Sequence, residues 1–309
     1  MSTAEKQPRV LVLGAGGFIG THLVSALQAQ GRSVIAATRT PLPMARPEVS
    51  NVIDTFLDSG TFSRLLENCD AVIHTAAHST PGSSMATPLL DGDLRTTLSL
   101  LEALQAYPSC RLLFLSSAGT LYGDRIEPAS ETDPLRPRSY HGAGKAAAEQ
   151  FIQAWASQYS GTAIIIRPSN VYGDGQRPRR GFAIVPTTMQ CAMEGSELQI
   201  YGDGAQVRDY LHVRDLTNLC VGALEAPVPV GTHVFNAASG VATSLEQLIA
   251  DIESVSGLPV KRRYVAARPA DVDTSLLDPC SARETFGWSA SVSLQQGLAE
   301  TWDWFRTQA

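Results

Sequence analysis

The apolar residues in the first half of the chain form short, β-branched runs that alternate with longer segments of helical spacing. Such short runs are typical of strands buried in a parallel sheet. The longer segments repeat apolar residues every three or four positions, which predicts helices that cover the sheet and hence a series of βαβ units. Strands are expected at Arg9 to Leu13, Ser33 to Ala37, Ala71 to His74, Arg111 to Ser116 and Ala163 to Arg167, and helices at Phe18 to Gln30, Leu94 to Tyr107 and Gly142 to Tyr159.

The pattern changes after Arg167 and Pro168, where Gly-, Pro- and Arg-rich stretches separate shorter elements. We therefore expect an α/β protein with a Rossmann-type doubly wound parallel sheet over residues 1–170 and a smaller C-terminal substrate lobe over residues 171–309. Some elements of the second part are expected to return to the first domain. Because the sequence shows no repeat or linker, the lobes should pack tightly and share a cleft.

Composition and charge narrow the class of protein. The chain has 309 residues, 44% of them apolar, and a formal net charge of -6, which argues against a nucleic-acid partner. The N-terminal segment lacks the apolar core of a signal peptide, and no apolar run is long enough to cross a bilayer, so we expect a cytoplasmic protein without a membrane partner. Five scattered cysteines without a CxxC pair predict buried, reduced thiols and no metal site.

Three glycines, Gly14, Gly17 and Gly20, follow the first predicted strand and open the first predicted helix. Glycines permit a tight turn and close backbone approach, while a helix N-terminus offers unpaired N–H groups and a positive dipole end. A glycine triplet between a strand and a helix therefore predicts a site for the pyrophosphate of a dinucleotide. Phe18 and Ile19 belong to the same predicted cofactor loop.

The end of the second predicted strand bears on the choice of dinucleotide. An acidic residue usually stands there and accepts hydrogen bonds from the adenosine ribose. Here the position holds Thr38, followed by Arg39. Without the carboxylate a 2'-phosphate is not repelled, and a guanidinium can pair with it, which modestly favours NADP. Thr38 can still bond a ribose hydroxyl and Arg39 can be a solvated charge, so NAD stays open.

Residues at or near the ends of other predicted elements are further candidates for cofactor contacts. Ligands of open parallel sheets bind at the carboxyl ends of the strands. The small side chains after the strand at Ala71 to His74 would let a dinucleotide lie against the sheet. The candidates are Asp54, Thr55, Ala76, Ala77, Asp93 and Pro168.

Seven ordered sequence blocks resemble the extended short-chain dehydrogenase/reductases, and specifically the nucleotide-sugar epimerase/dehydratase family. The match runs from Val10 to about Phe305. The resemblance implies an NAD(P) cofactor, a nucleotide-diphosphate sugar as substrate, with a UDP-sugar favoured, and a homodimer formed through the helices at 94–107 and 142–159. The blocks are GAGGFIG (14–20), VIHTAA (72–77), FLSSAGTLYG (114–123), HGAGK (141–145), RPSNVYG (167–173), IYGDGAQVRDYLHV (200–213) and RPADV (268–272).

The resemblance also implies four substrate-binding residues. Asn170 and Arg208 match positions that hold the diphosphate or nearby groups, Arg268 matches an arginine on the phosphates, and Asp271 matches a carboxylate on the nucleotide ribose. Guanidinium groups form bidentate bonds to phosphate oxygens, so these residue types suit that ligand. The arginines at 177, 179 and 180 match no family block and are expected to form a solvated loop.

The proton-transfer site departs from the family pattern at two positions. In the family a tyrosinate takes a proton from a sugar hydroxyl, a lysine four residues later lowers the tyrosine pKa, and a serine or threonine assists. Lys145 matches the lysine, but His141 stands at the tyrosine position and Ala118 at the assisting hydroxyl. Ser117 and Thr120 keep hydroxyl groups close by.

Three interpretations of this replacement stay open. His141 can be the acid/base itself, because the charge of Lys145 disfavours the imidazolium form. Alternatively, Tyr140 can take over, although it lies round the helix from the usual face. Finally, the site can have lost its redox chemistry.

The sequence thus predicts an NAD(P)-dependent epimerase or keto-reductase acting by hydride exchange at a carbon of a nucleotide-diphosphate sugar. The residue pair at 119–120 is Gly-Thr, where family dehydratases carry an Asp-Glu pair after the threonine, which counts against 4,6-dehydration. The rival hypothesis is a catalytically silent protein that binds NAD(P) or a nucleotide sugar and has a regulatory role.

Overall fold

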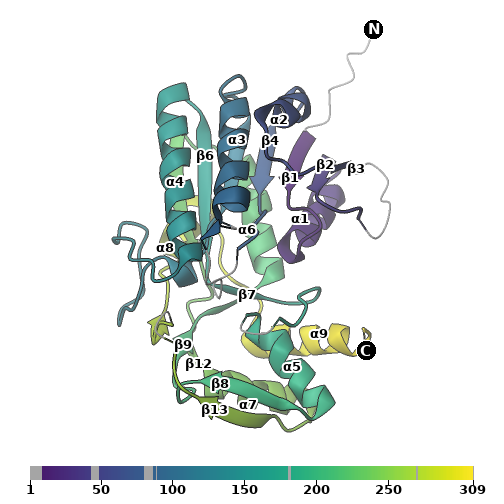
Figure 1. Cartoon of the computed structure of the whole chain (residues 1–309), viewed down its shortest axis with the longest axis vertical. Helices are drawn as coiled ribbons and strands as arrows, with labels where there is room; N and C mark the ends of the chain where they lie inside the picture. The colour runs from purple at the N-terminus through teal and green to yellow at the C-terminus, as the bar shows by residue number, and fades with distance from the viewer. Residues whose placement is uncertain are drawn as a thin grey trace.

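Seven strands form one parallel sheet in the part of the chain that the computed structural model describes, residues 9–42, 49–79, 86–87, 89–179, 182–268 and 271–308. The strand order is β11-β6-β5-β4-β1-β2-β3. Figure 1 labels β6, β4, β1, β2 and β3 in this order across the sheet. This order reverses between β1 and β4, so crossovers lead to both faces of the sheet. The strands are β1 (Arg9–Leu13), β2 (Ser33–Thr38), β3 (Val49–Ile53), β4 (Ala71–His74), β5 (Arg111–Leu115), β6 (Thr162–Pro168) and β11 (Gly231–Ala237).

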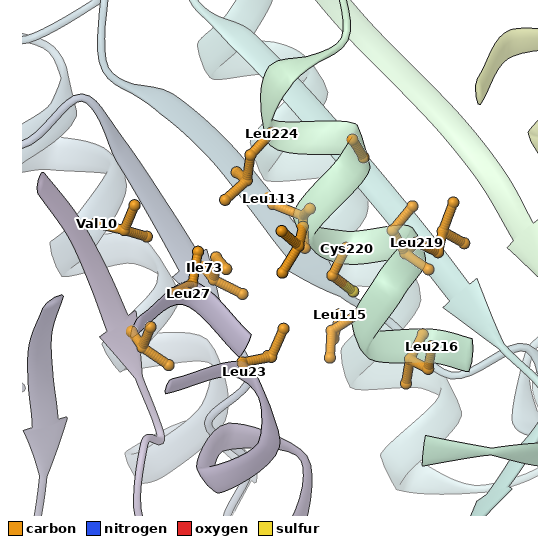
Figure 2. Close-up of a cluster of buried hydrophobic side chains, with 14 of the residues drawn as sticks. Val10, Leu23, Leu27, Ile73, Leu113, Leu115, Leu216, Leu219, Cys220 and Leu224 are labelled. Atoms are coloured by element: carbon orange, nitrogen blue, oxygen red, sulfur yellow. The ribbon is translucent and has the colours of Figure 1, made fainter. Parts of the chain in front are cut away.

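Helices cover both faces of the sheet. The helices α1 (Phe18–Ala29) and α6 (Val213–Glu225) pack on one face, while α2 (Ser59–Leu66), α3 (Arg95–Leu104) and α4 (Tyr140–Tyr159) pack on the other. Figure 2 shows Leu23 and Leu27 of α1 and Leu216 of α6 turned toward the sheet. All three leucines are fully buried, and each such burial contributes about 1.5–3 kcal/mol.

A smaller lobe packs below the carboxyl ends of the strands (Figure 1). Its core lies between three helices, α5 (Ile184–Glu194), α7 (Leu245–Ser256) and α9 (Leu294–Arg306). The parallel pair β8 (Glu197–Tyr201) and β13 (Lys261–Val265) covers α7. The remaining elements are short: β7 (Asn170–Tyr172), β9 (Val207–Arg208), β10 (Tyr210–His212), β12 (Thr243–Ser244), β14 (Thr274–Ser275), α8 (Cys280–Phe286), a π-helix η1 (Leu89–Leu94) and a 3-10 helix η2 (Ala118–Thr120).

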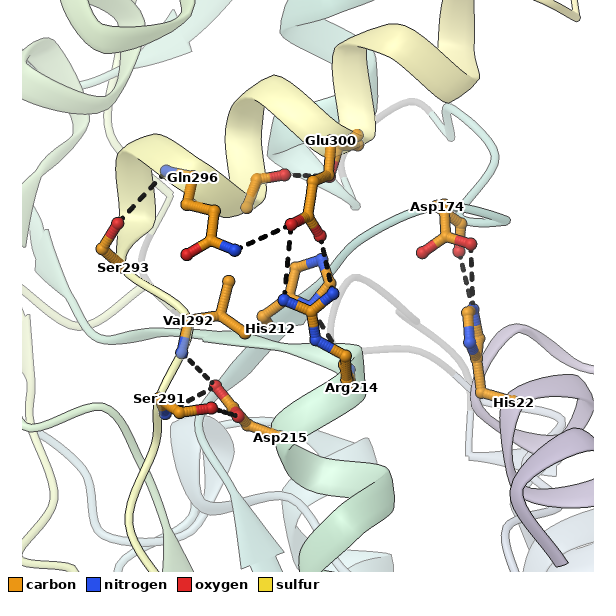
Figure 3. Close-up of polar contacts among 12 residues, drawn as sticks. His22, Asp174, His212, Arg214, Asp215, Ser291, Val292, Ser293, Gln296 and Glu300 are labelled. Atoms are coloured by element: carbon orange, nitrogen blue, oxygen red, sulfur yellow. Dashed lines mark hydrogen bonds and ion pairs between the residues drawn. The ribbon is translucent and has the colours of Figure 1, made fainter. Parts of the chain in front are cut away.

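Polar contacts connect the sheet layer to the smaller lobe. Asp215 in the first turn of α6 accepts hydrogen bonds from the backbone N–H groups of Ser291 and Val292, just before α9 (Figure 3). His22 of α1 contacts the backbone oxygen of Asp174, in the loop after β7, at 2.8 Å. These contacts hold α1 and α6 against the smaller lobe, and so fix the position of that lobe relative to the sheet layer.

The expected fold class is confirmed: the chain forms a doubly wound parallel sheet with a C-terminal lobe. All the strands and helices expected in the first half form, and the largest shift of an end is at α3, which stops at Leu104 instead of Tyr107. Three elements after residue 171, α6, α8 and β11, pack in the sheet layer. No helix in the described residues is long and apolar enough to span a bilayer.

The expectation of buried thiols is right for two cysteines only. Cys110 and Cys220 are buried, whereas Cys69, Cys191 and Cys280 are partly exposed, and no disulfide links these five described residues. Cys110 directly precedes β5 and Cys220 lies on α6, and both pack in apolar clusters. Cys69 lies between α2 and β4, Cys191 lies on α5, and Cys280 is the first residue of α8. The described residues contain no cluster of three or more His, Cys, Asp or Glu side chains that could hold a metal ion.

One ion pair lies fully inside the sheet layer. The guanidinium of Arg167 on β6 donates to both carboxylate oxygens of Glu149 on α4, at 2.6 to 3.2 Å, and also to the hydroxyl of Tyr122 at 2.7 Å. The Glu149 and Arg167 side chains are 0% and 5% exposed. Tyr122 in turn donates to Asn236 of β11. The network therefore ties α4 to two neighbouring strands.

We predict that Glu149→Gln lowers the free energy of unfolding by about 3–5 kcal/mol, because it leaves the buried Arg167 charge without its partner. Glu300→Gln is the control, since Glu300 pairs with Arg214 at the surface, where side chains are 38% and 48% exposed. That change should cost about 0–1 kcal/mol. Urea denaturation followed by circular dichroism measures both. Similar losses in the two variants would contradict a stabilising role of the buried pair.

Candidate active site

The glycine loop forms a preorganised anion site at the N-terminus of α1. Gly14 has φ +90 and its N–H donates to the Ala37 oxygen at 3.0 Å, while the Gly17 N–H donates to the Gly14 oxygen at 2.9 Å. Gly17 occupies the N-cap position, where no side chain caps the helix. The first N–H groups of α1 therefore keep their capacity to bind an anion.

Gly20 permits the close packing of α1 on this loop. A Cβ atom at Gly20 would lie 2.1 Å from the Gly14 oxygen and 2.8 Å from the Ala15 Cα. A Cβ atom at Gly14 would lie 2.7 Å from the Ala76 nitrogen. These positions therefore exclude a side chain, as the predicted phosphate loop requires.

A single cleft of about 1370 Å³ brings together most residues predicted for the site. It runs from the glycine loop, along the carboxyl ends of the strands, into the smaller lobe. Asp54 and Asp93 are not among its lining residues. The predicted site residues that line it are Gly14, Gly17, Phe18, Ile19, Gly20, Thr38, Arg39, Thr55, Ala76, Ala77, Ser117, Thr120, His141, Lys145, Pro168, Asn170, Arg208, Arg268 and Asp271.

The candidate cofactor residues at the ends of β2 and β3 differ in whether their side chains already have partners within the chain. Thr38 is buried, and its hydroxyl donates to the side chain of Asn51 at 3.0 Å, whereas Arg39 is exposed. The Asp54 carboxylate accepts from the N–H of Thr55 at 2.5 Å and from the hydroxyl of Thr61 at 3.2 Å. The Thr55 N–H bond is the main cause that lowers the pKa of Asp54. Asp54 therefore holds the turn after β3.

Helix α4 carries His141 and Lys145 on one face, as their spacing predicts. Ser139 caps the helix by accepting from the Gly142 N–H at 3.1 Å. A Cβ atom at Gly142 would lie 2.2 Å from the Thr120 oxygen, so this glycine lets α4 approach the loop after β5. Gly142 of the HGAGK block thus lets α4 bring both candidate catalytic side chains to the strand ends.

Lys145 is buried at the wall of the cleft. Its Nζ donates to the Leu115 oxygen at 2.8 Å and lies 4.6 Å from the centroid of the Phe114 ring. Burial lowers the pKa of Lys145 to about 8, against the opposing effects of Asp93 and Glu149. The ammonium group thus lies at the end of β5, in the wall of the cleft.

His141 is only 6% exposed, yet it lines the cleft. Its Nδ1 atom lies 2.8 Å from the Ser79 hydroxyl oxygen. Burial, and then the charge of Lys145, lower the pKa of His141 to about 4, while Asp93 acts in the opposite direction. The imidazole is therefore neutral at physiological pH, as one of the three sequence interpretations requires, with burial as the larger cause.

The alternative base, Tyr140, is the first residue of α4, is 53% exposed and does not line the cleft. The helix starts with a regular cap at Ser139, so no distorted first turn brings the phenol into the site. Thr120 donates its hydroxyl to the Ser117 oxygen at 3.0 Å, and both residues line the cleft. Ser117 and Thr120 thus share the cleft with His141.

The predicted substrate residues of the smaller lobe are engaged with their neighbours. Arg268 and Asp271 form a bidentate ion pair at 2.8 and 2.9 Å, and the Arg268 guanidinium lies 4.3 Å from the Tyr201 ring centroid. Arg208 donates to the backbone oxygens of Val207 and Val272.

On the side of the cleft nearest the sheet, Asn170 donates to the Asp209 oxygen at 3.0 Å. Each predicted substrate residue thus has a partner within the chain in this structure.

Sequence reasoning missed three groups of lining residues. Ser116 is 6% exposed, and its hydroxyl has no partner among the described residues. Ser79 follows β4 and contacts His141. Arg177 and Arg179 belong to the loop expected to be merely solvated; they are exposed but line the cleft, while residue 180 lies outside the described residues. The strand-end rule could have found Ser116, which directly follows β5.

Known proteins resemble this chain over its whole length. The profile described as "NAD dependent epimerase/dehydratase family" matches residues 10–238. The UDP-glucose 4-epimerase of Mycolicibacterium smegmatis is 31% identical over 97% of this chain and 99% of its own. The dTDP-4-dehydro-6-deoxy-D-allose reductase of Streptomyces bikiniensis is 31% identical, with 96% of each chain covered. The similar proteins thus include an epimerase and a reductase.

A solved structure shares both lobes. MoeE5 in complex with UDP-glucuronic acid and NAD has a TM-score of 0.89 and 31% sequence identity to this chain, with 97% of this chain and 100% of that chain covered.

Proposed function

Because the chain belongs to the NAD dependent epimerase/dehydratase family, we propose that it is an NAD(P)-dependent epimerase or keto-reductase that acts on a nucleotide-diphosphate sugar. The observation that supports this function best is the pairing of a neutral, buried His141 with Lys145 in the wall of the shared cleft. A proton acceptor and a cation thus stand together at the strand ends, where a base is needed.

The residues of the sheet edge fit a dinucleotide. The uncapped N-terminus of α1 can hold the pyrophosphate, and Gly14 and Gly20 leave no side chain in its way. The partnerless Ser116 hydroxyl and the Lys145 ammonium are available farther along the cleft. When bound, the nicotinamide group supplies the position that accepts or returns a hydride at the sugar carbon.

His141 takes the proton of the sugar hydroxyl at Nε2 in this proposal. No hydrogen bond between described residues ends on that atom, and Nδ1 is held by Ser79. Burial, and then the charge of Lys145, lower the pKa of His141 and so keep the ring neutral beforehand. Ser117 or Thr120 assists by donating to the same sugar oxygen. Because imidazole is shorter than a phenol, the sugar must approach α4 more closely or through one water.

The smaller lobe binds the nucleotide diphosphate in this proposal, with a UDP-sugar as the favoured ligand. Asn170, Arg208 and Arg268 all line the cleft. Arg268 would turn from Asp271 to a phosphate oxygen, which leaves the carboxylate to accept from ribose hydroxyls. The proteins of known structure that resemble this chain include one bound to UDP-glucuronic acid, which supports this ligand class.

We predict that His141→Ala lowers kcat/KM about 10²- to 10⁴-fold, because the proton loses its acceptor. Tyr140→Phe should leave turnover unchanged, since Tyr140 does not line the cleft. The measurement is conversion of UDP-, GDP- and dTDP-sugars with NAD or NADP, analysed for epimerised or reduced product. Turnover that survives His141→Ala would overturn the base role. Tight cofactor binding without turnover of any sugar would favour the silent binding protein.

The pH profile should differ from that of an ordinary histidine base. His141 must be neutral to accept a proton, so activity is present above its pKa of about 4 and is lost as pH falls through that value. Lys145 must be charged, so activity declines as pH rises through its pKa of about 8. We predict a plateau between these values in kcat/KM. An acid limb near 6.5, the unperturbed histidine pKa, would contradict the effect of burial.

The enzyme should also accept NADP, because Arg39 is exposed at the cleft and no carboxylate ends β2. We predict that Arg39→Ala weakens NADPH binding about tenfold or more and leaves NADH binding nearly unchanged, since only NADPH offers a phosphate to the guanidinium. Titration of cofactor fluorescence measures both constants. Arg32→Ala is the control, because Arg32 pairs with Glu225 outside the cleft. Equal losses for the two cofactors would remove Arg39 from cofactor choice.

A further inference from the structure

We infer that Ser79 and Asp93 are positioning residues that hold the His141 imidazole with its proton on Nδ1 and its lone pair on Nε2. This inference rests on the proposed function, in which His141 is the base. The Ser79 hydroxyl contacts His141 Nδ1 at 2.8 Å, and it also donates to the Asp93 carboxylate. The three side chains come from three separate elements: the loop after β4, the π-helix before α3, and the first turn of α4.

The number of available protons decides the direction of these bonds. The Asp93 carboxylate accepts from the N–H of His78, from the N–H of Ser79 at 3.1 Å, and from the Ser79 hydroxyl. A hydroxyl has one proton and two lone pairs. With that proton given to Asp93, the Ser79 oxygen can only accept from His141, so Nδ1 must carry the ring proton. Nε2 is then the nitrogen with the free lone pair.

The surroundings preserve this arrangement. Ser79 is 4% exposed and His141 is 6% exposed, so water competes little for their hydrogen bonds. A Cβ atom at Gly92 would lie 2.1 Å from His78 Nδ1, so the glycine lets the π-helix approach the loop that carries Ser79. Asp93 therefore reaches two consecutive backbone N–H groups as well as the hydroxyl.

The same contacts assist the proton transfer itself. When the sugar O–H gives its proton to Nε2, the ring becomes a cation whose Nδ1–H still donates to Ser79. The negative charge of Asp93 then acts on this cation through the Ser79 hydroxyl, and no further proton moves. Asp93 also offsets the repulsion from Lys145, which agrees with its effect on the pKa of His141. Neither Ser79 nor Asp93 needs to touch the substrate.

The ring tautomer tests this inference directly. Two-dimensional long-range ¹H–¹⁵N spectra of protein labelled with ¹⁵N-histidine distinguish protonated from unprotonated ring nitrogens, and His141→Gln identifies the relevant signals. We expect Nδ1 protonated and Nε2 unprotonated at neutral pH in the wild type, and loss of this preference in Ser79→Ala and Asp93→Asn. Ser79→Thr keeps a hydroxyl and should restore it. Wild-type protein protonated on Nε2, or an unchanged tautomer in Ser79→Ala, would overturn the inference.

Turnover gives the second measurement. Ser79→Ala should lower kcat by about 10² or more with little change in KM, as expected when a base loses the group that sets its tautomer. Ser99→Ala is the matched control, because Ser99 is a buried serine of α3 whose hydroxyl donates to the Leu57 oxygen at 3.1 Å. It should leave tautomer and kcat unchanged. A loss in Ser99→Ala equal to that in Ser79→Ala would show a merely structural effect and overturn the inference.

Failure of the proposed function gives a different result. If His141→Ala retains turnover while the wild-type tautomer is the one expected, His141 is not the base, but Ser79 and Asp93 still orient its ring. If the tautomer is wrong while His141→Ala loses turnover, His141 remains the base and the positioning role of Ser79 and Asp93 is refuted.

Discussion

Helix α4 is held on the sheet by polar contacts within an otherwise apolar interface, and the geometry of the cleft depends on them. Glu149 pairs with Arg167 of β6, and Lys145 donates to the Leu115 oxygen at the end of β5. A helix rises 1.5 Å per residue, so a slip of α4 by one residue would displace His141 by about that distance. Catalytic groups tolerate displacements of only about 0.5 Å. The contacts that fix the helix therefore also set the register of the site.

The charge of Lys145 favours the proton-accepting form of either base at residue 141. A tyrosine would accept a proton as an anion, which a neighbouring cation stabilises by attraction. His141 accepts a proton as a neutral ring, and the same cation favours that form by repelling the imidazolium. A cation at Lys145 would attract a tyrosinate and repels an imidazolium, and in both cases it favours the form that accepts a proton. Burial adds to the effect on histidine, since desolvation also disfavours the charged ring.

Features set by one element could be predicted from the sequence, whereas contacts between loops could not. Helical spacing places His141 and Lys145 on one face, and parallel strands bring the glycine loop to the common edge. The contact of Ser79 with His141 joins residues 62 positions apart, and it depends on how closely α4 approaches the loop after β4. The sequence predicts that Asp54 contacts the cofactor. In the structure its carboxylate oxygens accept hydrogen bonds from Thr55 and Thr61. Strand periodicity does not reveal such a local turn.

An imidazole places a demand on its surroundings that a phenol does not. A phenol has one oxygen, which is the reacting atom in any orientation, but a neutral imidazole accepts a proton at only one of two nitrogens. A histidine base therefore needs a partner on its other nitrogen, and Ser79 occupies that position. The assisting hydroxyl of the family is missing at Ala118, which is 1% exposed and packs in an apolar cluster. The Ser79 hydroxyl lies instead beside the histidine ring, where it would meet this requirement if His141 is the base, as we propose.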